Sequence, residues 1–263
     1  MPYVERITKA GKTIEIEKYY TSRYKKPGIK RGDRVKPTEE QQEKINTRQA
    51  ERKLRVLMNA NFGYGDYHVV LDYIRKKGEP ERSREEMRRD MDVFFRELRK
   101  EFKKQGKELK YIHVMEIGQK GARHHHLVIN QIDTKIIQKC WYKAYEGHNR
   151  VKVFPLDDSG NYAKLAAYFI KYTDTHKKNA DGALQGKRWN ASKNLIRPEP
   201  EYRIITERAS FRCDAKPIKG YYVDQDSIVR GVHDPEYSGY GYFRYILVKE
   251  DDGGGDEEKD EEF

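Results

Sequence analysis

The sequence predicts an α+β fold with a ferredoxin/RRM-like split βαβ core, in which a central, mostly antiparallel sheet is flanked by helices. Between residues 67 and 178, apolar segments of strand length alternate with amphipathic segments of helix length in the order β-α-β-β-α-β-α. Two of these strands are separated by only three residues, which predicts a hairpin and therefore an antiparallel pair. Capping-box motifs open the longest helices.

The first 65 residues are expected to form an N-terminal segment that precedes this core. A short hairpin around residues 10–12 is followed by an arm rich in lysine and arginine. Thr38 begins the motif TEEQ, whose spacing is that of a capping box, and the helix that follows is expected to run to about Met58. The glycines of NFGYGD then break the chain.

The core domain is expected over residues 66–200. Ser83 and Glu86 have the spacing of a capping box for a long helix, and Asp133 or Thr134 caps the next one. A basic loop, GALQGKRWNASKNL, follows the last helix. The predicted strands are 67–74, 111–118, 124–130 (122–130 when its hairpin pairing is included) and 150–154, and the predicted helices are 83–104, 134–147 and 161–178.

The charge of the chain is strongly positive and unevenly distributed. The last thirteen residues contain eight acidic groups and one lysine, a charge of −7, so the formal +11 of the whole chain leaves +18 for residues 1–250. A surface of this charge attracts polyanions, because binding to phosphates releases their counterions. Nucleic-acid binding is the favoured interpretation, and a highly charged, solvated surface without such a partner is the alternative.

Two further segments follow the core. Residues 201–250 are expected to be a C-terminal β-rich extension with the short strands YRIIT, YYVD and YFRYILV, either continuing the sheet or forming a small DNA-docking lobe. Residues 251–263 are expected to be a disordered acidic tail. That tail either recruits a basic partner, limits nonspecific DNA binding, or only improves solubility.

Cysteine content and hydropathy predict a cytoplasmic protein without membrane contact. Only Cys140 and Cys213 occur, and they form no CxxC motif. The N-terminus MPYVERITKAGK has no apolar region, and no stretch approaches the length of a membrane span.

The strand that follows GAR begins with three histidines, and strand alternation determines which of them act together. Pairing residue 118 with residue 122 places Glu116 opposite His124 and Val114 opposite His126, so the carboxylate and two imidazoles share one face. This set is typical of an open divalent metal site that suits Mn²⁺, Zn²⁺, Co²⁺ or, with phosphate and water, Mg²⁺. The alternative is a polar hairpin whose histidines meet solvent or one another. His125 and His113 are expected to pack under the helices.

The last core helix carries two tyrosines at the edge of its apolar arc. Tyr168 and Tyr172 lie one turn apart, with Lys164 and Lys171 just beyond them. A tyrosine hydroxyl can attack phosphorus when a metal polarises the phosphate and a cation stabilises the developing charge. Alternatively, these tyrosines simply pack their rings inward and point their hydroxyls outward.

Together the two constellations resemble the HUH endonucleases, and among them the rolling-circle replication initiators of bacteriophages and plasmids. The resemblance covers roughly residues 66–200. The middle histidine stands where that family usually has a bulky hydrophobic residue, and the strand YHVVLDYI corresponds loosely to its first motif. The matching residues are His124 and His126 for the HxH motif, Glu116 for the upstream acidic ligand, Tyr168 and Lys171 for the YxxK motif, and Tyr172 for its second tyrosine.

The resemblance implies a metal-dependent nickase and strand transferase that acts on single-stranded DNA at a replication origin. Glu116, His124 and His126 would hold Mn²⁺ or Mg²⁺, and Tyr168 would form a 5′-phosphotyrosine and leave a 3′-hydroxyl primer. Tyr172 would rejoin the displaced strand, while Lys171 would hold the phosphate. A host polymerase and helicase are the implied partners, since the chain has no Walker motif.

DNA contacts are expected from cations near the metal strand and in the basic loop. Trp189 either stacks on an exposed base or packs in the core. Two other functions stay open: a noncatalytic single-stranded nucleic-acid-binding protein on the same scaffold, and a transposase or relaxase of the same superfamily. The candidate DNA-binding residues are Arg123, Lys164, Lys187, Arg188, Trp189 and Lys193, with the basic N-terminal arm in addition.

Overall fold

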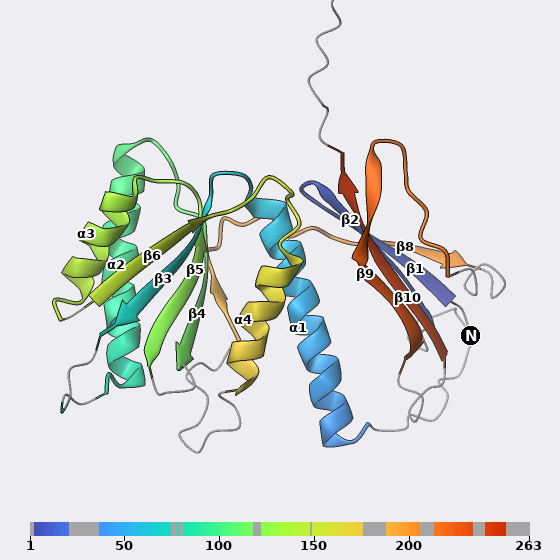
Figure 1. The fold of residues 1–263 in the computed structure, drawn as a ribbon, viewed down its shortest axis with the longest axis horizontal. Coiled ribbons are helices and arrows are strands. Elements are labelled where there is room, and N and C mark those ends of the chain that lie inside the picture. The colour runs from blue at the N-terminus through green and yellow to red at the C-terminus, as the bar shows by residue number, and fades with distance from the viewer. Residues whose placement is uncertain are drawn as a thin grey trace, which may run out of the picture.

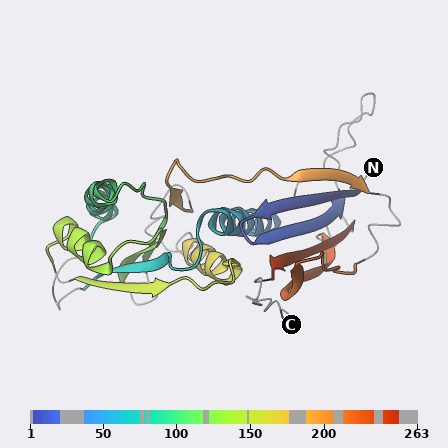
Figure 2. The ribbon, with the colours of Figure 1, turned by 90° about the horizontal axis from the view of Figure 1, so that it is seen from above.

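The protein contains two antiparallel five-stranded sheets, with two helices, α1 and α4, between them (Figure 1, Figure 2). The predicted α+β class is therefore confirmed. The structure is a computed structural model, and it describes residues 3–20, 37–74, 78, 81–117, 122–147, 149–175, 188–205, 213–233 and 240–250.

The core follows the predicted order of elements as far as α4, and the predicted basic loop contains one further short strand, β7, that pairs with β4. The helix after the histidine strand ends at Ala144, three residues earlier than expected, because Tyr145 leaves helical geometry with φ −143° and ψ 103°. The core elements are β3 (Tyr67–Tyr73), α2 (Arg84–Lys104), β4 (Tyr111–Ile117), β5 (Arg123–Ile129), α3 (Thr134–Ala144), β6 (Asn149–Pro155), α4 (Ala163–Thr175) and the short β7 (Asn190–Ala191).

The core sheet has the strand order β6-β3-β5-β4-β7. The strands β3 and β4, joined by α2, both pair antiparallel with β5 and so run parallel to each other on either side of it. This is the split βαβ arrangement that the sequence predicts. It places the histidine strand β5 at the centre of the sheet.

Each face of the core sheet is covered by a different pair of helices. On one face, Val69 and Leu127 pack with Phe94 of α2 and Trp141 of α3. The opposite face packs on α1 (Glu39–Asn61) and α4. Its cluster includes Val114 and Val128 from the strands, Leu54 and Met58 from α1, and Phe169 and Ile170 from α4.

The middle histidine of the motif belongs to the face under α2 and α3, as expected. His125 is fully buried, and its two ring nitrogens lie 2.9 Å from the Tyr73 hydroxyl and 3.0 Å from Nε2 of His113. Both neighbours come from adjacent strands. The polar ring is therefore accommodated in a core position because each of its nitrogens has a partner.

The second sheet joins the two ends of the chain and has the order β8-β1-β2-β10-β9. The N-terminal hairpin pairs with strands from the C-terminal extension, so the extension neither continues the core sheet nor stands alone. The basic arm and the acidic tail lie outside the described residues. The strands are β1 (Tyr3–Ala10), β2 (Thr13–Tyr20), β8 (Glu201–Ile205), β9 (Tyr221–His233) and β10 (Tyr240–Lys249).

Local signals at the helix starts and at the first turn agree with the structure. The capping boxes of Thr38 with Gln41 and of Ser83 with Glu86 are both formed. Gly11, in the turn between β1 and β2, has φ +56°, and a Cβ there would collide with the backbone carbonyl of Asn59. Glycine therefore allows the hairpin turn to lie directly against α1. None of the helices within the described ranges is long and apolar enough to cross a membrane.

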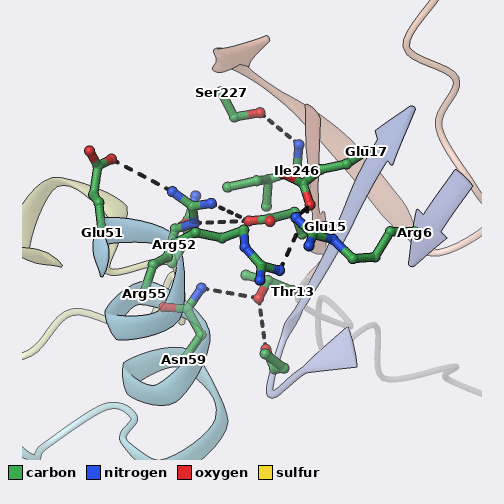
Figure 3. A network of polar contacts seen from close by, with 12 residues as sticks. Arg6, Thr13, Glu15, Glu17, Glu51, Arg52, Arg55, Asn59, Ser227 and Ile246 are labelled. Carbon is green, nitrogen blue, oxygen red and sulfur yellow. Dashed lines mark hydrogen bonds and ion pairs between the residues drawn. The ribbon is translucent and has the colours of Figure 1, made fainter. Parts of the chain in front are cut away.

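A buried polar network connects the second sheet to α1 (Figure 3). Arg55 of α1 is only 2% exposed, and its Nε donates to Oε2 of Glu15, 3.0 Å away. Asn59, one turn later, donates to Thr13 Oγ1 at 3.0 Å and accepts the backbone N–H of Tyr162 at 2.9 Å. Asn59 thus links the second sheet to the segment immediately before α4.

Replacing one partner of the buried Arg55–Glu15 pair should lower the free energy of unfolding more than replacing both. Arg55→Met should lower the free energy of unfolding by about 3–5 kcal/mol, because Glu15 keeps an uncompensated buried charge. Adding Glu15→Leu should recover much of that loss. Urea unfolding measures the stability of both variants. The control is Lys44→Met, in the exposed Glu40–Lys44 pair of the same helix, which should change the free energy of unfolding by less than about 1 kcal/mol. A double variant no more stable than Arg55→Met would contradict the assignment.

Buried His113 predicts acid sensitivity. Burial, assisted by the charge of His126, lowers the pKa of His113 to about 3. The unfolded chain binds this proton near pH 6.5, so the free energy of unfolding should fall as the pH drops from about 6.5 towards 3, by up to about 1.4 kcal/mol per pH unit. Urea unfolding at several pH values should show a shallower slope for His113→Gln than for the unchanged protein. Equal slopes would contradict this prediction.

Candidate metal centre

The hairpin of β4 and β5 has the predicted register, with Glu116 opposite His124 and Val114 opposite His126. The carboxylate and the two imidazoles lie on the face towards α1 and α4. Oε1 of Glu116 is 3.2 Å from Nε2 of His124, and its Oε2 is 2.7 Å from Nε2 of His126. The potential ligand atoms of the three residues all lie within 4.8 Å of one another, so this triad could hold a metal ion.

The donor set of the triad fits a divalent cation. Oε2 of Glu116 and Nε2 of His126 are buried and 2.7 Å apart, yet their geometry does not form a hydrogen bond. A divalent cation that displaced the proton from Nε2 would meet a lone pair of each atom, and nitrogen with carboxylate oxygen suits Mn²⁺, Zn²⁺ or Co²⁺.

The electrostatics keep the carboxylate charged. Burial by itself raises the pKa of the Glu116 carboxyl, but the adjoining imidazoles of His124 and His126 outweigh burial and lower it to about 2. The Glu116 carboxyl is therefore anionic across the physiological pH range and could serve as an oxygen ligand. At 2% exposure, it has little water to compete with a bound cation.

Sequence reasoning missed His68, which lies next to the triad. Strand β3 pairs Val70 with His126, so the alternating residue His68 shares the triad face. Its Nε2 lies 3.2 Å from Nδ1 of His126, and the two rings stack with centroids 5.5 Å apart. Burial, followed by the charge of His126, lowers the pKa of His68 to about 4, so it stays neutral and its Nε2 can accept a hydrogen bond from an N–H at Nδ1 of His126. His68 thus orients His126, and the period-two pattern of YHVVLDYI could have revealed it.

A second residue of β3 extends the site along the sheet. Asp72 pairs with His124 on one side and with Arg150 of β6 on the other. Its Oδ2 lies 2.9 Å from Nε of Arg150 and 3.2 Å from Nζ of Lys152. Both cations remain half exposed on the triad face. They are positive groups near the triad that sequence reasoning did not assign.

Helix α4 brings Tyr168 to the triad. Phe169 and Ile170 are buried in the core and fix the rotation of the helix, which leaves Tyr168 37% exposed at its edge. The ring of Tyr168 lies 5.3 Å from that of His126 and 6.4 Å from that of His68. Lys171 is exposed on the same helix. Tyr172 belongs to α4, but its side chain is outside the described part of the structure.

The other predicted DNA contacts are spread over several elements. Arg123 pairs with Glu81 at 3.0 Å, and Lys164, which is 93% exposed, pairs with Asp226 of β9 at 3.5 Å. The rest belong to the segment around β7, apart from Lys187, which lies outside the described residues. There, Arg188 donates to Thr47 of α1 at 3.1 Å, Trp189 packs partly against the core shared by α1 and α4, and Lys193 is exposed.

The comparison with protein families matches the part of the chain that contains this site. Residues 66–178 match the family model of the replication-associated protein ORF2/G2P. The match supports a replication initiator of the Rep type. It spans β3 to α4 and therefore includes the triad, His68 and Tyr168, whereas α1 and the second sheet lie outside it. The comparisons with curated proteins and with solved structures gave no match.

The triad predicts metal binding that depends on both its ligands and His68. Isothermal titration with Mn²⁺ alone should show binding that Glu116→Gln or His124→Ala abolishes. His68→Phe should weaken it by about 10- to 100-fold, because His126 loses its orienting partner. His113→Gln, on the opposite face, is the control and should retain the affinity. Undiminished binding by Glu116→Gln would contradict the assignment.

Proposed function

We propose that this protein is a replication initiator of the HUH endonuclease type, which nicks single-stranded origin DNA with a tyrosine nucleophile. The observation that carries the proposal is the position of Tyr168, whose partly exposed ring lies 5.3 Å from that of His126 in the triad. A nucleophile, a potential metal site and exposed cations on one sheet face are the components that phosphoryl transfer needs. The family match over the same residues supports it independently.

In the proposed reaction, the hydroxyl oxygen of Tyr168 attacks the scissile phosphorus. The new bond joins that oxygen to phosphorus, and the bond from phosphorus to the 3′-oxygen breaks. Tyr168 gives up its hydroxyl proton as this bond forms and the departing 3′-oxygen takes up a proton, so the products are a 5′-phosphotyrosine and a 3′-hydroxyl. One phosphodiester replaces another, so the step needs no nucleotide energy source.

The residues around Tyr168 have separate roles in this proposal. Glu116, His124 and His126 hold a divalent ion, Mn²⁺ or Mg²⁺, which when bound supplies Lewis-acid polarisation of the phosphate. His68 orients His126. Lys171, three residues after Tyr168, neutralises charge on the phosphate. Arg150 and Lys152, half exposed on the triad face, add positive potential along the strand's path.

The later steps extend the same chemistry. The 3′-hydroxyl primes synthesis by a host polymerase, with a host helicase separating the strands. Tyr172, one turn after Tyr168 in α4, makes the second transfer that closes the displaced strand. Arg123, Lys164, Arg188, Trp189 and Lys193, with Lys187, contact the DNA, and the reaction takes place in the cytoplasm.

Two other functions share parts of this proposal. A transposase or relaxase would use the same site, but the family match names a replication-associated protein and so favours replication. A noncatalytic binder of single-stranded nucleic acid would need neither metal nor tyrosine. Formation of a covalent protein–DNA adduct distinguishes the nickase from such a binder, which forms none.

The decisive experiment looks for a covalent protein–DNA adduct that survives denaturation. Pooled single-stranded DNA from the protein's own replicon is incubated with the protein and Mn²⁺ or a chelator. The adduct should require metal, and Tyr168→Phe should reduce it by at least about three orders of magnitude because the nucleophile is lost. Tyr142→Phe, at a 61% exposed tyrosine on α3, is the matched control and should leave the adduct unchanged. DNA binding without an adduct under any metal would favour the binder instead.

A further inference from the structure

A large groove lies along the β4 edge of the core sheet, separate from the triad. It has a volume of about 990 Å³. One wall is α1 and the other is α2, and each helix contributes residues at spacings of three and four that form a single face. Between them lie β4 and the segment around β7. The lining residues are Asn46, Gln49, Ala50 and Lys53 of α1, Arg88, Met91, Asp92 and Phe95 of α2, Tyr111, His113 and Met115 of β4, and Arg188, Trp189, Asn190, Ala191 and Arg197.

The charge of the groove is positive. Its lining includes the cations Lys53, Arg88, Arg188 and Arg197 against the single carboxylate of Asp92. Lys53 and Arg88 project from opposite walls and are exposed. The groove therefore presents positive charge from both sides to an anionic ligand.

Aromatic rings and side-chain amides lie among these cations. The rings of Tyr111 and Trp189 are partly exposed, and Tyr111 is backed by the buried ring of Phe95, with centroids 4.0 Å apart and an interplanar angle of 25°. Asn46, Gln49 and Asn190 add exposed amides, which can both donate and accept hydrogen bonds. Phosphates match the cations, base faces match the rings, and base edges match the amides.

We propose that this groove binds the single-stranded DNA that flanks the nicking site, with bases between α1 and α2 and phosphates on Lys53 and Arg88. The inference rests on the proposed function for its substrate class and adds where the strand is held. Combined cations and stacking rings are how proteins bind single strands, whose bases are free to leave a stack. A duplex keeps its base faces inside the helix and could not use the aromatic part of the groove.

Strand β4 connects the groove to the triad. Met115 lines the groove, and the next residue, Glu116, points to the opposite face, where it contacts His124 and His126. Among the described residues, β7 pairs with β4 only at Ile112 and His113. A strand lying along this edge therefore runs towards the end of β4 that carries Glu116.

The test measures binding of a fluorescent oligothymidylate of about 20 nucleotides by anisotropy across a salt series. The double variant Lys53→Gln/Arg88→Gln should bind about 10- to 30-fold more weakly near 0.1 M salt. Its plot of log affinity against log salt should flatten by about 1.4, since each lost phosphate contact contributes about 0.7. The matched control is Arg48→Gln/Arg89→Gln, which removes two exposed arginines from the same helices outside the groove and should change neither value.

Photocrosslinking gives a second readout that does not depend on charge. Oligothymidylate carrying 5-iododeoxyuridine should crosslink to Trp189 or Tyr111, and mass spectrometry identifies the peptide. Affinity and salt slope unchanged in Lys53→Gln/Arg88→Gln, or crosslinks only outside the groove, would overturn the inference.

The same variants separate this inference from the proposed nicking reaction. Tyr168→Phe should bind the oligonucleotide normally but form no adduct, while Lys53→Gln/Arg88→Gln should need more DNA to form the same amount of adduct. If Lys53→Gln/Arg88→Gln binds normally and the adduct requires Tyr168, only the groove inference is overturned. If that double variant binds weakly and the adduct persists in Tyr168→Phe, only the assignment of the nucleophile is overturned. A protein that binds no single strand overturns both.

Discussion

The antiparallel pairing of β4 with β5 is the constraint on which the candidate site depends. Side chains alternate across a strand, so the register that sets Glu116 opposite His124 also brings His126 to the same face and sends His125 to the other. A slip of one residue would exchange the two sets. The slip is opposed because His125 is held between Tyr73 and His113, while Leu127 and Ile129 are fully buried under α2 and α3.

The histidines on the two faces of the core sheet have different surroundings. Under α2 and α3, the buried rings of His113 and His125 contact each other at 3.0 Å, and burial lowers the pKa of both so that they stay neutral. Towards α1 and α4, the imidazoles adjoin a charged carboxylate, and the partly exposed ring of Tyr168 lies 5.3 Å from that of His126. The same residue type is structural on one face and a candidate ligand on the other because of its neighbours.

Helix α1 is shared by both halves of the molecule. Its apolar side completes the core under α4, and its polar side holds Glu15 and Thr13 of the second sheet through Arg55 and Asn59. Because Asn59 also accepts the backbone N–H of Tyr162, the second sheet, α1 and the start of the tyrosine helix form one continuous network. The outer face of α1 then provides one wall of the cationic groove.

The sequence by itself determined the core elements from β3 to α4, the face of the sheet to which each histidine of β5 points, and the triad of Glu116, His124 and His126, because strand alternation and hairpin length are local properties. It also placed Tyr168 at the edge of its helix. Only the tertiary structure decided that the two ends of the chain share a sheet, that His68 and Asp72 adjoin the triad, and that Lys53 and Arg88 face one groove. Those juxtapositions depend on strand order and helix packing between residues distant in the chain, which no local period encodes.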